Sequence, residues 1–203
     1  MATNGGKGGR PPIADEDELR TRAIAVLQRD GYRNVTMARI AAETGVSVRT
    51  LHRYFPTKAD IVWGGIEGSL DALRDGLAHA DDSLPPMEAI AAVVASVFDQ
   101  DADEVAVGRA RMRLIATEPD LASTRPDTYR QWREETVAYF SRRLGLPPDD
   151  VVPQAAGAAL QTTIMSGLSW WALQDDPDLS PVDAVTRALH GLSSATRPGP
   201  RSA

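Results

Sequence analysis

Residues 36–61, "TMARIAAETGVSVRTLHRYFPTKADI", constrain the fold of this chain more than any other segment. Two short helical patterns meet there at one glycine. Thr36 can cap the first helix, and Ser47 can cap the second, which runs to about Tyr54. Gly45 supplies the positive φ that a tight turn between two helices requires. The segment therefore predicts two short helices that cross at a fixed angle.

Packing needs account for only some of these side chains. Ala41 is small enough to let the two helices cross closely, and Val46 and Leu51 can pack beneath them. The residues left over are mostly hydrogen-bond donors and cations: Arg39, Ser47, Val48, Arg49, Thr50, His52, Arg53 and Tyr54. This pattern is typical of a helix-turn-helix whose second helix enters the major groove of DNA. The alternative is an ordinary pair of helices with a solvated basic face.

The charge distribution favours a polyanion as the partner of the N-terminal part. Residues 1–60 carry ten Lys and Arg against seven Asp and Glu, a net charge of +3. The whole chain of 203 residues has a net charge of −6, so the remainder carries −9. Such asymmetry between parts of a chain suggests that only the basic part contacts nucleic acid. The alternative is an uneven scatter of charges without function.

The rest of the chain predicts helices separated by turn signals, with no sustained strand alternation. We expect an all-α protein of about nine helices, near residues 15–30, 36–43, 47–54, 57–77, 87–98, 103–117, 124–144, 150–174 and 181–195.

The same segment resembles the DNA-binding signature of the TetR family of bacterial transcriptional regulators. The resemblance rests on these residues: Thr36, Ile40, Ala41, Gly45, Val46, Ser47, Thr50, Leu51, Tyr54, Phe55 and Lys58. It implies a helix-turn-helix domain at 13–58 and a helical ligand-binding and dimerisation domain at 59–197. A disordered basic arm at 1–12 and a disordered tail at 198–203 would flank them.

The resemblance also implies which residues contact double-stranded DNA, at a short inverted repeat read by a dimer. We expect Val48, Arg49 and Thr50 near base edges, with Ser47 at the start of the reading helix. We expect phosphate contacts from these residues: Thr36, Arg39, His52, Arg53, Tyr54 and Lys58. His52 departs from the family pattern, which has Tyr there. Lys7 and Arg10 in the arm could add a DNA contact or belong to an inert tail.

Two apolar stripes in the last two predicted helices, at about 150–174 and 181–195, suit a homodimer interface of four helices. The first stripe is Ala155, Ala159, Thr163 and Gly167. The second stripe is Val182, Val185, Leu189 and Leu192. The alternative is that both stripes are buried within a single chain.

Large apolar side chains of the C-terminal part predict a pocket for a mostly apolar small effector. The candidate lining residues are Trp63, Met112, Ile115, Tyr129, Trp132, Thr136, Phe140, Met165 and Trp170. Any of them could instead be ordinary core. The pattern of three arginines at Arg109, Arg111 and Arg113 resembles that of a subgroup of TetR regulators that bind acyl-coenzyme-A-like molecules. In such a pocket, a cation could neutralise a carboxylate or phosphate of the ligand. Three arginines on a helix could equally be a solvated face.

An enzyme is the rival class. The histidines are His52, His79 and His190, and no two have metal-ligand spacing. No motif marks a nucleophile, so we expect no catalysis, metal or cofactor.

Residues 155–173 are uncharged, but their polar and small residues argue against membrane insertion. We therefore expect a cytoplasmic regulator, most simply a repressor released by its effector. A transcriptional activator and a ligand-independent regulator are the alternatives.

Overall fold

The computed structural model describes residues 15–99 and 101–195, which contain eleven α-helices and no strand. The all-α prediction is thus confirmed. The chain divides into two compact units, the first ending at Ile61 and the second beginning at Val62. The proposed arm at 1–12 and tail at 198–203 lie outside the described residues.

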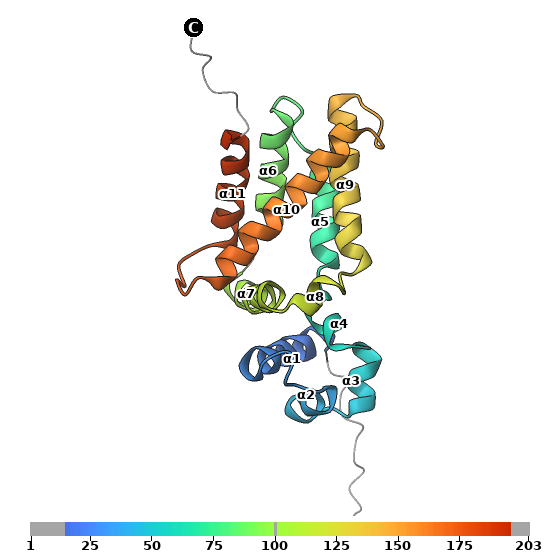
Figure 1. Ribbon diagram of the computed structural model, residues 1–203, viewed down its shortest axis with the longest axis vertical. Coiled ribbons are helices and arrows are strands. Elements are labelled where there is room, and N and C mark those ends of the chain that lie inside the picture. Colours follow the sequence, from blue (N-terminus) through green and yellow to red (C-terminus); the bar gives the residue numbers. More distant parts are fainter. Residues whose placement is uncertain (1–14, 100, 196–203) are drawn as a thin grey trace, which may run out of the picture. The chain divides into compact units, whose positions relative to one another are not determined.

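The first unit is a small helical domain. Its helices are α1 (Glu16–Asp30), α2 (Met37–Thr44), α3 (Val48–Tyr54) and the greater part of α4 (Lys58–Trp63). Helix α2 packs against both α1 and α3 (Figure 1). The apolar side chains between the helices are almost completely buried: Leu19, Ala23, Ile24, Leu27, Ile40, Ala41, Leu51 and Phe55. This packing fixes the angle between α2 and α3.

A buried arginine ties α1 to the short helix α4. Arg20 is 6% exposed, and its Nη1 donates to the backbone oxygens of Asp60 at 2.7 Å and Ile61 at 3.2 Å. Its Nη2 donates to Glu16 at 2.7 Å, and the guanidinium lies over the ring of Phe55, 4.6 Å from the centroid. Because a six-residue helix has few bonds of its own, these contacts help to hold α4 in place.

The second unit is a helical bundle. Its helices are α5 (Glu67–Ala78), α6 (Pro86–Val97), α7 (Ala102–Thr117), α8 (Pro119–Ala122), α9 (Asp127–Leu144), α10 (Val151–Leu173) and α11 (Pro181–Ala195). Helix α10 is central and packs against α7, α9 and α11, while α6 packs against α5 and α11 (Figure 1). No helix in the described ranges has the combined length and hydropathy that a membrane span needs.

Polar atoms in the bundle core find backbone partners. Trp171 is 2% exposed, and its indole nitrogen donates to the oxygen of Leu179 at 2.8 Å. The Tyr139 hydroxyl donates to the oxygen of Pro86 at 3.2 Å and accepts a bond from Arg143 at 3.0 Å. Burial raises the pKa of Tyr139, so this hydroxyl keeps its proton and its bond at neutral pH.

Two short helices account for the difference from the nine expected. The predicted helix at 57–77 is divided into α4 and α5, because Gly64 and Gly65 follow Trp63 and Gly65 adopts a φ of 74°. The turn predicted at "EPD" instead contains the four-residue helix α8, which begins at Pro119. Proline is favourable in the first turn of a helix, so this element has a local cause.

Some residues of the two apolar stripes predicted for the dimer interface are buried within the chain, and others are exposed. Gly167 of the first stripe is buried beneath α11 of the same chain, where an added Cβ would lie 3.2 Å from the oxygen of Ala184. In the second stripe, Val185 and Leu189 are also buried in the core of the same chain. Ala155 and Ala159, by contrast, are exposed. For these three buried residues, the alternative of packing within one chain is the correct one.

Candidate functional site

The ends of α2 and the start of α3 are fixed by three local features that the sequence predicted. The Thr36 hydroxyl accepts the backbone N–H of Arg39 at 3.2 Å, and the Ser47 hydroxyl accepts that of Thr50 at 3.0 Å. Gly45 has a φ of 74° and a ψ of 20°, the left-handed conformation that a helix C-cap requires. These bonds set where α3 begins and which of its faces is turned outward.

Helix α3 has one buried and one exposed side. Leu51 is fully buried, whereas Arg49, His52 and Arg53 are exposed and Val48 is 41% exposed. Among the described residues, Arg49 has no hydrogen bond or ion pair, so its guanidinium can reach a partner outside the chain. Arg53 lies over the ring of Tyr54, 4.9 Å from the centroid. The exposed side of α3 therefore carries positive charge and one exposed apolar side chain, that of Val48.

Arg39 has carboxylate neighbours in its own chain. Its Nη2 lies 3.0 Å from Asp30 and 3.4 Å from Glu43, and Arg29 binds the same two acids. The hydrogen bond from Arg29, helped by the charges of Arg29 and Arg39, lowers the pKa of Asp30. Asp30 is therefore ionised at neutral pH, and a phosphate would have to compete with it for Arg39.

Lys58 and His52 also make contacts within the chain. The Lys58 ammonium donates to the backbone oxygen of Tyr32 and lies 4.5 Å from the centroid of that ring. Nδ1 of His52 lies 3.0 Å from the backbone oxygen of Pro56. Because a carbonyl oxygen can only accept, Nδ1 carries the proton in this bond. The other nitrogen, Nε2, then donates only when the imidazole is protonated.

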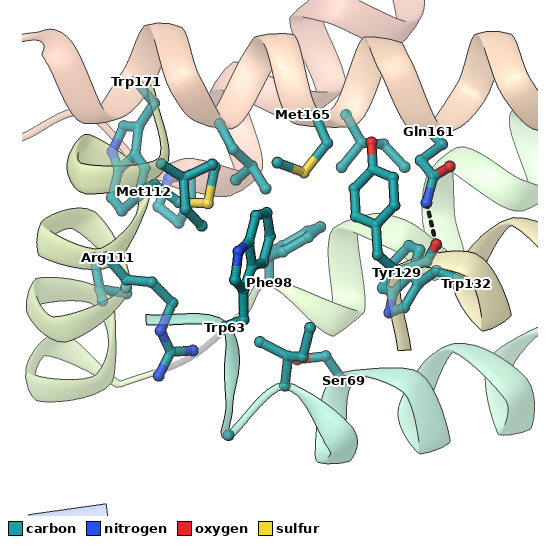
Figure 2. A pocket seen from close by; sticks show the side chains of 18 residues that line it. Trp63, Ser69, Phe98, Arg111, Met112, Tyr129, Trp132, Gln161, Met165 and Trp171 are labelled. Atoms are coloured by element: carbon teal, nitrogen blue, oxygen red, sulfur yellow. Dashed lines mark hydrogen bonds between the residues drawn. The ribbon is translucent and has the colours of Figure 1, made fainter. Parts of the chain in front are cut away.

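The second unit contains a cavity of about 160 Å³ (Figure 2). Its walls come from the end of α4, the start of α5 and helices α7, α9 and α10, with one residue from the end of α6 and one from the start of α11. The residues around it are Trp63, Gly65, Ile66, Ser69, Phe98, Val105, Gly108, Arg111, Met112, Ile115, Tyr129, Trp132, Gln161, Ile164, Met165, Leu168, Trp171 and Pro181. Five of these are aromatic, so the cavity is mainly apolar.

Six of the nine predicted pocket residues line this cavity: Trp63, Met112, Ile115, Tyr129, Trp132 and Met165. The placement predicted for Thr136, Phe140 and Trp170 is wrong. Thr136 and Phe140 lie on the part of α9 that is buried in the bundle core. Trp170 is 44% exposed and lies beside Arg187 on the outer side of α10 and α11. The aromatic pattern alone could not separate the cavity-facing side of each helix from its other sides.

Sequence reasoning missed Ser69, Phe98 and Gln161 as lining residues. The amide nitrogen of Gln161 donates to the backbone oxygen of Tyr129 at 2.5 Å, as Figure 2 shows. One signal was available: Gln161 is a long polar side chain within an uncharged helical stretch, and such a group needs a partner when it is buried. Phe98 is the residue that caps α6, and no periodic pattern places it.

The three arginines of α7 have different roles. Arg109 donates to the oxygens of Asp176 and Leu179, both at 2.8 Å, and lies over the ring of Trp171. Arg113 donates to the oxygen of Ala172 at 2.9 Å. These two residues hold the end of α10 and the loop that follows it. Arg111 alone of the three lines the cavity.

Comparison with known proteins agrees with this arrangement. Residues 19–62 match the tetR family of bacterial regulatory proteins, and residues 84–197 match the MftR C-terminal domain. MftR of Mycobacterium tuberculosis, named as a regulator of mycofactocin biosynthesis, is 28% identical over 172 residues, which cover 85% of this chain and 87% of that protein. The transcriptional regulator BetI of Agrobacterium fabrum is 31% identical over 141 residues, 68% of each chain.

A solved structure gives the same fold. The fatty acid degradation regulator FadR of Bacillus halodurans superposes with a TM-score of 0.67, at 16% identity, over 93% of this chain and 98% of that one. The two domain matches together span most of the described residues, and the second alone covers more than half of the chain. The chain belongs to the TetR family of bacterial transcriptional regulators.

Proposed function

We propose that this protein is a dimeric, cytoplasmic repressor that binds a short inverted repeat in DNA and leaves it when a mostly apolar small molecule binds. The exposed side of α3 carries this proposal, because Val48, Arg49 and Thr50 stand at the start of a helix whose backbone is fixed by caps. An arginine beside an apolar side chain is suited to reading a guanine and a thymine methyl in the major groove. Neighbouring cations would hold phosphates and set the register.

Helix α10 supports the homodimer. It carries no Asp, Glu, Lys or Arg from Val151 to Leu173. Several of its residues are nevertheless exposed, including Val151 at 76%, Trp170 at 44% and Leu173 at 48%. An exposed uncharged face with large apolar residues is typical of a protein interface. In a twofold dimer, this face would pack against its copy, together with the outer side of α11.

The cavity supports an effector-dependent regulator over a ligand-independent one. Its volume and aromatic walls suit a small apolar guest, and Trp63 in its wall belongs to the same helix, α4, as Lys58. A ligand can release DNA only if it binds the two states of the protein differently. A transcriptional activator would share every one of these features, so repression is the part that a transcription assay must decide.

A selection from genomic DNA fragments at low salt tests the DNA-binding part. We expect the retained fragments to share one inverted repeat whose half-sites lie about one helical turn, ~34 Å, apart. We also expect a strong loss of affinity as salt is raised, because bound phosphates release counterions. Retained fragments without a common inverted repeat would contradict the proposal.

A further inference from the structure

We propose that the effector is a small aromatic carboxylate: one ring enclosed in the cavity, with its anionic group at Arg111. This inference rests on the proposed function in one respect only, that the cavity in the second unit is the effector site. It names the chemical class of the ligand from the size, the walls and the charge of that cavity. A long acyl chain, the other class that the sequence suggested, fits these features less well.

The size of the cavity favours a single ring. Its volume is about 160 Å³. An apolar protein cavity of about 150 Å³ is known to enclose one benzene molecule. A long acyl chain contains many more carbon atoms than benzene, so this volume could enclose all of it only if the packed walls moved apart. Protein interiors resist such movement because they are close-packed.

The walls of the cavity are suited to a flat guest. Trp63 and Tyr129 meet edge to face, with their ring centroids 6.2 Å apart, and Phe98 and Trp132 form a tilted pair at 6.3 Å. Figure 2 shows these rings together with Met165 around one space. Aromatic rings prefer edge-to-face and offset contacts with other rings, and thioethers pack favourably on them. A ring therefore gains more from these walls than a flexible chain of the same size.

The polar groups favour an anion. Arg111 is the one charged residue among the described residues that line the cavity, and no lining residue is an acid. The Ser69 and Tyr129 hydroxyls and the Trp132 indole N–H also line it, and none of them bonds to another residue in the described part of the chain. All three can donate, and one of the two amide N–H groups of Gln161 is bonded to the oxygen of Tyr129. A carboxylate supplies a negative charge for Arg111 and can accept hydrogen bonds from these donors.

Isothermal titration calorimetry with three probes of similar size separates the requirement for an aromatic ring from the requirement for a negative charge. Benzoate has the ring and the charge, benzamide has the ring without the charge, and hexanoate has the charge without the ring. We expect benzoate to bind the full-length protein at least tenfold more tightly than either of the others. Equal or tighter binding of hexanoate would overturn the ring requirement, and equal or tighter binding of benzamide would overturn the charge requirement.

Two variants assign the charge to Arg111. We expect Arg111→Gln to remove the preference for benzoate over benzamide while benzamide still binds, which shows that the cavity is intact. Arg130→Gln is the matched control, because Arg130 is an exposed arginine of α9 that does not line the cavity and pairs with Glu134. It should bind the probes as the unmodified protein does. An unchanged benzoate preference in Arg111→Gln would contradict the assignment.

Release from operator DNA distinguishes this inference from the proposed function. If benzoate binds in the expected order but leaves the protein on its operator, the ligand class stands and the proposed switch fails. If long acyl compounds release the operator and benzoate does not bind, the switch stands and the ligand class is wrong.

Discussion

Arg49 and Lys58 carry the same charge in the first unit but have different surroundings. Arg49 is exposed, and in the described part of the chain it has no hydrogen bond or ion pair. Lys58 is half-buried, with its ammonium on the backbone oxygen and the ring of Tyr32. The family resemblance includes Lys58 and not Arg49, yet of these two residues only Arg49 is available to DNA without giving up a contact. Lys58 stabilises the domain whether or not it also reaches a phosphate.

This difference predicts opposite effects on stability. Lys58→Ala should lower the free energy of unfolding by about 1 kcal/mol, because it removes a cation–π contact and a charged hydrogen bond. Arg49→Ala should change it by less than about 0.5 kcal/mol, as is usual for an exposed side chain without partners. Urea denaturation followed by circular dichroism measures both. Equal losses in the two variants would show that the contacts of Lys58 contribute nothing.

At the scale of the elements, α4 was predicted only as the start of a longer helix. Its predicted continuation into α5 is interrupted by Gly64 and Gly65, and a helical period does not report such a break. Its position depends on Arg20, which is forty residues away in the sequence from Asp60. The caps of α2 and α3, by contrast, could be predicted because each involves residues at most four positions apart.

The link between α1 and α4 can be tested with a matched pair of arginines. Arg20 and Arg22 both bind a glutamate four residues earlier in α1, but only Arg20 is buried and also bonds to α4. Arg20→Met should lower the free energy of unfolding by about 2–3 kcal/mol, since two backbone oxygens lose a charged donor. Arg22→Met should cost less than about 1 kcal/mol, the usual value of an exposed ion pair. Urea denaturation of both variants decides this, and equal costs would mean that the bonds to α4 do not hold it.

At the scale of the whole molecule, the sequence predicted the helical architecture and the family better than the site in the second unit. Helix periods, caps and turns are local, so they are visible in a single sequence. Cavity walls depend on which side of each helix faces inward, and that is decided by contacts between distant residues. Trp171 and Trp170 are neighbours in the chain, yet the first lines the cavity and the second lies outside.

The central claim is that α3 reads DNA sequence through Arg49. Fluorescence anisotropy titrations test it most directly, with unmodified protein and Arg49→Ala on two duplexes: the selected inverted repeat and a scrambled duplex of equal length. We predict that the unmodified protein binds the repeat at least about 10³-fold more tightly than the scrambled duplex. Arg49→Ala should cost about 1–3 kcal/mol on the repeat and much less on the scrambled duplex. Equal losses on the two duplexes, or no preference of the unmodified protein for the repeat, would contradict the claim.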